Sequence, residues 1–274
     1  MAKKIMITGV HGLIAGALYE HLSAQEDRYE VYGLARRRVA SERVAGGRKV
    51  TIPENRFILA DLSDSEAVNG AFEGMDVVIH MAAVPDADAP WERIHQSNVL
   101  GAYHVFEACR QNRVKRMVYA STVMVSWGWF EEEPYRSIRD GRYEGNPADI
   151  PIVRATDPSR PMDLYAASKV WGEALAYQYS REGLSSLCLR IGWVNKEDAC
   201  TKADLGSVWC SQRDIIQLTE RCINAPEDLM FDVFYGLSDN RLRWADIDHA
   251  REVVGYQPED GYGYGESKGK NDGV

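Results

Sequence analysis

The stretch IMITGVHGLIAG, residues 5–16, passes from an apolar run through a glycine-rich turn into a segment with helical spacing. A short buried strand is expected at residues 5–7, and a helix is expected over residues 13–24. Gly9 permits a tight turn, and Gly12 lets backbone amides approach a negatively charged group. The N-terminus of the helix adds free N–H groups and a partial positive charge. The stretch therefore predicts a strand–loop–helix unit that binds a diphosphate.

The same alternation of apolar strands and amphipathic helices continues through the first two thirds of the chain. Further strands are predicted at residues 29–35, 56–60, 76–82, 116–122 and 184–191. Helical spacing is found near residue 63, over 90–112 and over 163–182. This order predicts an α/β protein with a doubly wound parallel sheet of the Rossmann type, because parallel neighbours are joined by crossover helices.

The end of the second predicted strand bears on the choice of a nicotinamide cofactor. An acidic residue about twenty residues after the glycine loop commonly binds the adenosine ribose of NAD. Here the strand ends in Arg36, Arg37 and Arg38 instead. Guanidinium groups suit a ribose 2′-phosphate, so the sequence favours NADP over NAD, with a solvated basic turn as the alternative. Asp61, after the third strand, is expected to border the adenine.

A tyrosine and a lysine open the helix predicted over residues 163–182. Tyr165 and Lys169 are four residues apart and therefore share one helical face. A nearby ammonium favours the ionised phenol, which lowers the pKa of the tyrosine towards a range useful for proton transfer. Thr122 ends the fifth strand, where its hydroxyl could hold the substrate oxygen. These three residues are the predicted catalytic group.

The strand and helix rhythm weakens after Gly192. A helix, a strand and a helical stretch are still predicted, at residues 214–225, 229–235 and 244–254. Proline and glycine make residues 126–161 irregular. We expect a Rossmann NAD(P)-binding domain with the catalytic residues, a small C-terminal lobe that covers the substrate and the carboxyl edge of the sheet, and a flexible tail, at residues 1–192, 193–257 and 258–274.

Charge and cysteine content limit the classes of function. The 274 residues carry a formal net charge of −9, which argues against general affinity for nucleic acid or an anionic membrane and leaves a small-molecule substrate. No apolar stretch is long enough to span a membrane, and a strand starts at once, so we expect no signal peptide and a cytoplasmic location. The five cysteines match no metal or redox spacing, so free thiols and no metal site are expected.

Seven motifs occur in order between residues 5 and 192. They are Thr8-Gly9-x-x-Gly12, Asp61-Leu62, His80-Met81-Ala82-Ala83, Asn98-Val99-x-Gly101, Ala120-Ser121-Thr122, Tyr165-x-x-x-Lys169-x-x-Gly172-Glu173 and Leu189-Arg190-Ile191-Gly192. In this set the chain resembles the extended, epimerase/dehydratase-like branch of the short-chain dehydrogenase/reductase superfamily. The resemblance implies Thr122, Tyr165 and Lys169 as catalytic residues. It implies that the cofactor is bound by Gly9, His11, Gly12, Leu13, Ile14, Arg36, Arg37, Asp61, Leu62, Met81, Ala82, Ala83, Asn98, Tyr165 and Lys169.

Within that branch the chain is similar to the uronate dehydrogenases and related sugar dehydrogenases. The similarity includes Arg190-Ile191-Gly192 and Ser207-x-Trp209-x-Ser211-x-Arg213-Asp214 before a helix. It implies that Arg190 binds a substrate carboxylate, with a structural ion pair as the alternative, and that Val84 and Val123 contact the substrate. The Ser-Asn-His run of those enzymes appears here as Thr122-Val123-Met124, which argues against a uronate. The resemblance also implies a homodimer.

Three functions are compatible with these features. The first is an NAD(P)-dependent oxidoreductase that moves hydride between nicotinamide and a sugar, sugar acid or similar hydroxyl or carbonyl compound, with Tyr165 as acid or base. The second is a nucleotide-sugar epimerase or dehydratase with bound NAD(P), which the short segment after Gly192 disfavours. The third is a non-catalytic cofactor sensor, which retention of Tyr165 and Lys169 disfavours.

Overall fold

In residues 2–44 and 50–263, the part of the chain that the computed structural model describes, seven strands form one sheet. Their order is β3-β2-β1-β4-β5-β6-β7, and every neighbouring pair is parallel. The strands are β1 (Lys3–Thr8), β2 (Tyr29–Ala35), β3 (Phe57–Leu59), β4 (Val77–His80), β5 (Arg116–Thr122), β6 (Ser185–Ile191) and β7 (Phe231–Gly236). The predicted doubly wound parallel sheet is confirmed.

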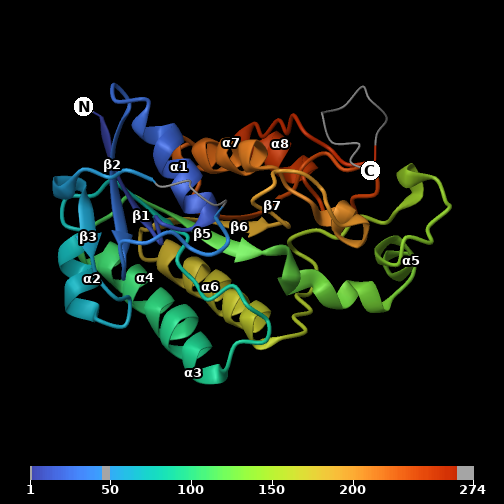
Figure 1. The fold of residues 1–274 in the computed structure, drawn as a ribbon, viewed down its shortest axis with the longest axis horizontal. Coiled ribbons are helices and arrows are strands. Elements are labelled where there is room, and N and C mark those ends of the chain that lie inside the picture. The colour runs from blue at the N-terminus through green and yellow to red at the C-terminus, as the bar shows by residue number, and fades with distance from the viewer. Residues whose placement is uncertain (1, 45–49, 264–274) are drawn as a thin grey trace.

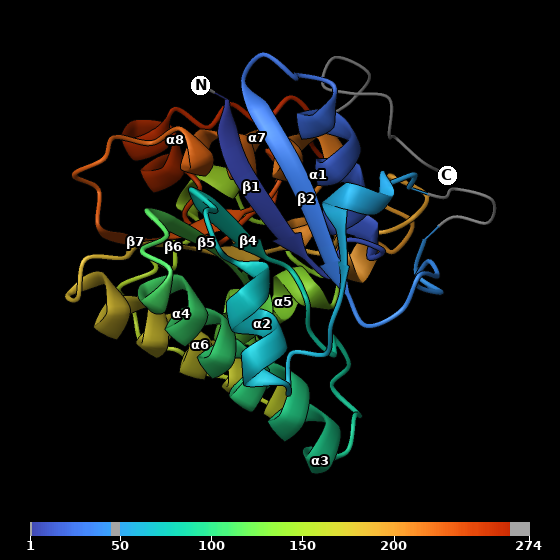
Figure 2. The same ribbon diagram turned by 90° about the vertical axis from the view of Figure 1, so that its left-hand side faces the viewer.

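Helices cover both faces of the sheet (Figures 1 and 2). One face is covered by α1 (Leu13–Ser23), α7 (Gln212–Ile223) and α8 (Asp248–Val254). The other is covered by α2 (Ser65–Ala71), α4 (Gly101–Gln111) and α6 (Leu164–Ser180). A short α3 (Trp91–Ile94) continues through a π-helical turn, η2 (His95–Leu100), into α4. None of the helices in the described ranges is long and apolar enough to cross a bilayer.

The two faces of the sheet have separate apolar cores because successive side chains of a strand point to opposite sides. On β1, Ile5 and Ile7 belong to the core beneath α1 and α7, whereas Met6 belongs to the core beneath α4 and α6. All three are fully buried. Burial on both faces explains why these strands read as continuous apolar runs and not as alternating ones.

The part after Gly192 shares the sheet with the part before it. β7 pairs with β6 from Ser186↔Phe231 to Ile191↔Gly236, and α7 packs against α1. The boundaries of the expected C-terminal lobe stay a prediction. Within the expected tail, the backbone N–H groups of Glu259 and Asp260 donate to Asp214 on α7, and residues 264–274 lie outside the described residues.

The irregular stretch predicted at residues 126–161 contains short helical turns. A 3₁₀ segment, η3 (Val123–Glu131), follows β5 directly, and α5 (Tyr135–Arg139) and η4 (Pro147–Asp149) come next. A parallel bridge between Val153 and Ala245 connects this stretch to the C-terminal part. The strand order reverses direction between β1 and β4, and the carboxyl ends of strands beside such a point form a crevice that commonly binds ligands.

Candidate active site and cofactor cavity

The phosphate loop joins β1 to α1 at the point where the strand order reverses. Gly9 has φ +71°, a conformation that favours glycine, and a Cβ added to it would lie 2.8 Å from the Cα of Ala82. The N–H of Gly12 donates to the carbonyl of Gly9 at 2.7 Å, and α1 begins at Leu13. The backbone therefore brings the N-terminus of a helix to the cavity, as a diphosphate site requires.

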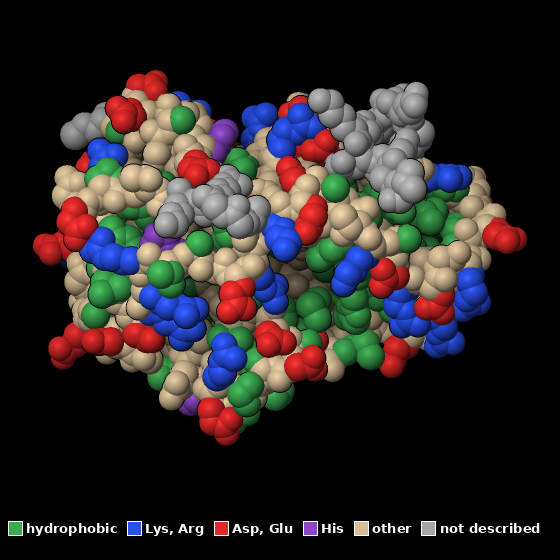
Figure 3. Space-filling view, in the orientation of Figure 1, with side chains coloured by type: hydrophobic (Ala, Val, Ile, Leu, Met, Phe, Trp, Pro, Cys, Tyr) green, Lys and Arg blue, Asp and Glu red, His purple; other side chains and the backbone are tan. Residues whose placement is uncertain are grey.

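A cavity of about 570 Å³ extends from this loop across the carboxyl ends of the strands. The space-filling view shows a hollow near the centre of this face, with charged side chains at its rim (Figure 3). Most of the predicted site residues line the cavity: Gly9, His11, Gly12, Leu13, Ile14, Arg36, Arg37, Asp61, Leu62, Met81, Ala82, Ala83, Thr122, Val123, Tyr165 and Lys169. The structure thus gathers residues from separate strands and helices around one space. Their roles stay predictions.

The three predicted catalytic residues meet at the end of β5 and the first turns of α6. Asp163 caps α6 by accepting the N–H of Ala166 at 2.7 Å, which fixes the start of the helix and hence the position of Tyr165. Both Thr122 and Tyr165 line the cavity, and the Thr122 hydroxyl lowers the pKa of Tyr165. Lys169 Nζ donates to the carbonyl of Ala120 at 2.7 Å and lies 6.0 Å from the ring centre of Tyr165. A hydroxyl pair beside a cation can accept a proton from a substrate hydroxyl.

Burial dominates the electrostatics of this group. It raises the pKa of Tyr165, and the neighbouring Thr122 hydroxyl and the positive charge of Arg43 oppose that rise. Burial also lowers the pKa of Lys169 to about 8. The ammonium of Lys169 donates to the carbonyl of Ala120, and its predicted effect on the tyrosine stays a prediction. Among the described residues, the charge of Arg43 lowers the pKa of Tyr165.

Two predicted contact residues lie behind the cavity wall. The side chain of Asn98, in η2, accepts the N–H of Val84 at 2.8 Å and donates to the Val84 carbonyl at 3.1 Å and to Ser168 Oγ at 3.1 Å. Val84 is buried with Ile94 and Tyr165 in a small apolar cluster. Neither Asn98 nor Val84 lines the cavity. The geometry gives them a positioning role, because they fix the loop after β4 against α6.

Arg190, the predicted substrate anchor, is turned away from the cavity. It is 3% exposed and forms a bidentate ion pair with Glu173: its Nε donates to Oε1 at 3.0 Å and its Nη2 donates to Oε2 at 2.9 Å. It also donates to Tyr235 Oη at 3.0 Å and to Ser159 Oγ at 3.3 Å. Glu173 lies on α6 and faces β6, so the structure places Arg190 in the alternative role, a structural ion pair.

The three arginines after β2 separate into two groups. Arg38 is paired with Glu54 on the surface, at 2.6 and 2.7 Å, and its guanidinium lies 4.5 Å from the ring centre of Phe57. Arg36 and Arg37 line the cavity. The N–H of Ser63 lowers the pKa of Asp61, and the charge of Arg36 acts in the same direction. Arg36 and Arg37 are therefore the two that could meet a 2′-phosphate.

The sequence analysis missed several cavity residues. Arg43 and Pro85 line it, and so does an apolar group of residues: Met124, Trp127, Trp193, Val194, Leu205 and Val208. For Trp127, the sequence allows either a pocket residue or a loop contact with the core, and the structure places it at the cavity. These residues belong to no motif, and segments distant in sequence bring them together. No signal in the sequence placed them at the cavity.

Comparison with known proteins agrees with this geometry. Residues 5–194 match the NAD dependent epimerase/dehydratase family. An NAD-dependent glucose-6-phosphate dehydrogenase from Haloferax volcanii is 29% identical over 266 residues, covering 95% of this chain and 94% of that protein. An L-arabinose 1-dehydrogenase (NAD(P)(+)) from the same organism is 32% identical over 241 residues, covering 81% of this chain and 92% of that protein.

A solved structure gives the same result for the fold. A mutant uronate dehydrogenase from Agrobacterium tumefaciens, complexed with NAD, superposes with a TM-score of 0.73 at 25% identity and covers 95% of this chain and 86% of that chain. These matches confirm the predicted resemblance to the epimerase/dehydratase branch and to its sugar dehydrogenases.

Proposed function

The chain belongs to the NAD dependent epimerase/dehydratase family, and from that premise we propose that it is a dehydrogenase that oxidises a hydroxyl group of a sugar or sugar acid. The observation that carries the proposal is that Thr122 and Tyr165 line the same cavity as the phosphate loop. The relatives that span almost the whole chain are named as dehydrogenases of sugars.

The residues present fit a dinucleotide. A Cβ at Gly9 would meet the backbone of Ala82, so glycine lets the loop pack on the segment after β4 while it still lines the cavity. Gly9, Gly12 and the start of α1 would hold the diphosphate, and Asp61 and Leu62 would border the adenosine. When bound, the nicotinamide supplies the acceptor for the hydride.

The chain's own groups handle the substrate proton. Tyr165 Oη accepts the proton of the substrate hydroxyl, and Thr122 Oγ1 holds the same oxygen beside it. Burial raises the pKa of Tyr165, so ionisation of the phenol needs a positive neighbour. Lys169, one helical turn away, is assigned to stabilise the ionised phenol during proton transfer. The apolar wall with Trp127 and Trp193 excludes water from the reacting atoms.

The proposal includes a preference for NADP over NAD. Its support is that Arg36 and Arg37 line the cavity beyond β2, where an acidic residue would be needed to select a ribose 2′-hydroxyl. The named relatives include one NAD-dependent enzyme and one NAD(P)(+) enzyme, so the family accommodates both coenzymes.

A nucleotide-sugar epimerase is the less favoured alternative. A UDP-glucuronic acid 4-epimerase from Bacillus cereus is 18% identical to this chain, and at that identity the likeness shows the fold alone. The sugar dehydrogenases match at higher identity over most of the chain.

Assembly as a homodimer in the cytoplasm completes the proposal. Exposed aromatic side chains occur on two neighbouring helices, Tyr103 on α4 and Trp171 and Tyr177 on α6, each between 42% and 52% exposed. Such a patch favours a partner surface. Light scattering should give the mass of two chains for the wild type and of one chain for Trp171→Glu. A monomeric wild type would contradict the dimer.

The cysteines bear on the proposed cytoplasmic location. All five are free thiols, as a reducing compartment permits.

The experiment that tests the function follows reduced nicotinamide by its absorbance. NAD⁺ and NADP⁺ are each combined with glucose, glucose 6-phosphate, glucuronate, galacturonate, galactose and arabinose. We expect coenzyme reduction with at least one sugar. Tightly bound coenzyme in the purified protein, together with no reduction across the panel, would favour the epimerase alternative.

A further inference from the structure

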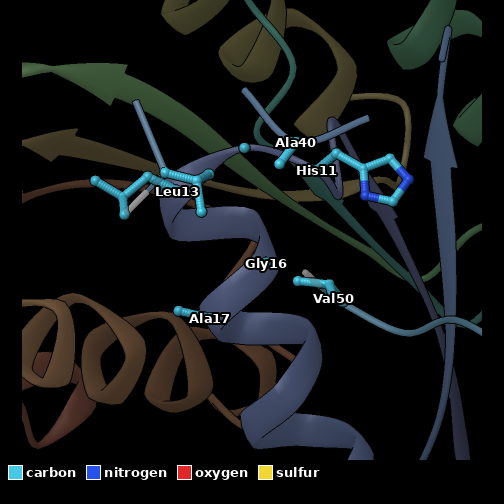
Figure 4. A pocket seen from close by; sticks show the side chains of 8 residues that line it. His11, Leu13, Gly16, Ala17, Ala40 and Val50 are labelled. Atoms are coloured by element: carbon cyan, nitrogen blue, oxygen red, sulfur yellow. The ribbon is translucent and has the colours of Figure 1, made fainter. Parts of the chain in front are cut away.

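The segment after β2 folds back over the phosphate loop. The N–H of Ser41 donates to the carbonyl of His11 at 2.9 Å, and the N–H of Val44 donates to the carbonyl of Ser41 at 2.9 Å. Figure 4 shows Ala40 and Val50 beside the first turns of α1. A Cβ on Gly16 would lie 2.8 Å from Val50, so glycine in α1 permits this approach. The backbone around residue 43 is therefore anchored to the N-terminus of α1.

From this anchor the side chain of Arg43 reaches the opposite side of the cavity. Its Nη2 donates to the carbonyl of Pro85, in the loop after β4, at 2.6 Å. Both residues line the cavity. A guanidinium has five N–H donors, and within the described residues the Pro85 carbonyl is the acceptor recorded for them. The bond fixes the guanidinium while leaving further donors for a ligand.

Lys169, Arg36 and Arg37 also line the cavity, and the proposed function already assigns them to Tyr165 and to the coenzyme. Lys169 donates to the Ala120 carbonyl, and the charge of Arg36 acts on Asp61 after β3. Arg190 is paired with Glu173 and does not line the cavity. The charge of Arg43, in contrast, acts on Tyr165 and lowers the pKa of that phenol against the effect of burial. Arg43 is therefore a cavity-lining cation that the proposed function does not use and that can bind an anion.

We propose that Arg43 binds a negatively charged group of the sugar substrate, a phosphate or a carboxylate. The inference rests on the proposed function and replaces Arg190 as the anchor. A planar guanidinium fixed at one edge can give two parallel N–H bonds to phosphate or carboxylate oxygens. Arg43 would thereby select charged sugars over neutral ones and hold the substrate hydroxyl towards Thr122 and Tyr165.

The test compares charged and neutral members of matched sugar pairs. Steady-state kinetics are measured for glucose 6-phosphate against glucose and for galacturonate against galactose, with wild type, Arg43→Gln and Arg43→Lys. We expect Arg43→Gln to raise KM for the charged sugars about tenfold or more, because a hydrogen-bonded charge is lost. KM for the neutral sugars should stay within about twofold, and Arg43→Lys should restore part of the affinity.

Arg38→Gln is the control from the same segment. Arg38 is paired with Glu54 on the surface, so its loss should leave both KM values within about twofold. Equal increases in KM for both members of a pair would overturn the inference, as would a wild type that oxidises only neutral sugars. A loss of NADH affinity in Arg43→Gln with an unchanged ratio of KM values would assign Arg43 to the coenzyme diphosphate and also overturn it.

A binding measurement separates this inference from the proposed function. Calorimetric titration with glucose 6-phosphate needs no turnover. If the wild type oxidises no sugar but binds glucose 6-phosphate and Arg43→Gln does not, the dehydrogenase proposal fails and the anion site stands. If sugars are oxidised while Arg43→Gln binds glucose 6-phosphate as the wild type does, the anion site fails and the function stands.

Discussion

The two ends of the cavity are built in different ways. At the cofactor end, the loop of Gly9 and Gly12 contributes backbone atoms to the surface, and Gly9 lies against the backbone of Ala82. At the substrate end, side chains from separate segments form it, among them Trp127 after β5 and Trp193 after β6. A surface made of backbone can change little without loss of the fold, whereas a surface made of side chains can change residue by residue.

This difference agrees with the pattern among the relatives. The names of the two matched enzymes share a nicotinamide coenzyme and differ in the sugar, glucose 6-phosphate in one and L-arabinose in the other. A rigid cofactor end with a variable substrate end is how one fold serves several substrates. The contrast can be tested by substitutions that affect one end and spare the other.

The largest effect is expected where the two ends meet. Tyr165→Phe removes the phenol oxygen and keeps the buried ring, so kcat should fall by about 10²- to 10⁴-fold. NADH affinity, followed by fluorescence titration, should stay near the wild-type value because the phosphate loop is unchanged. Turnover that survives this substitution would contradict the proposed proton transfer.

The next effect tests whether Arg190 belongs to the scaffold or to the substrate end. Glu173→Gln leaves the buried Arg190 without a counter-charge, which should cost about 3–5 kcal/mol of unfolding free energy in urea. The control Glu182→Gln breaks a surface pair with Arg110 and should cost less than about 1 kcal/mol. If Glu173→Gln left the stability unchanged and raised KM for charged sugars, Arg190 would be assigned to substrate binding.

A smaller effect tests the rigidity of the cofactor end. Gly9 and Gly74 both have φ +71°, but only Gly9 has backbone within reach of an added Cβ. Gly74→Ala should cost about 1–2 kcal/mol from its left-handed conformation alone. Gly9→Ala should cost more, because the contact with Ala82 adds to that strain, and it should weaken NADH binding. Thermal unfolding with and without NADH measures both, and equal losses in the two variants would refute a tightly packed loop.

The smallest effect concerns coenzyme choice. Arg36→Ala together with Arg37→Ala should weaken NADPH binding about tenfold, because a charge-assisted pair with the 2′-phosphate is lost. NADH binding should change little. Fluorescence titration with both coenzymes compares them directly, and equal weakening of NADH and NADPH would remove the argument for NADP.

Local sequence was sufficient for much of the fold and for part of the site. The strands at β1, β2, β5 and β6 were predicted because apolar runs between helical segments are buried on both faces. The helical stretch predicted over residues 244–254 shortened to α8, and its first residues instead sit beside Val153. Long-range pairing of that kind leaves no periodic signal in the chain.

The sequence by itself determined the phosphate loop and the Tyr165–Lys169 pair, because each depends on neighbours within a few residues: a glycine at a positive φ and a spacing of one helical turn. Only the tertiary structure decided what the long side chains meet. Arg190 on β6 pairs with Glu173 on α6, and Arg43 donates to the carbonyl of Pro85 in the loop after β4. A flexible cation can take any partner within reach, and which one lies within reach depends on how the helices and loops pack on the sheet.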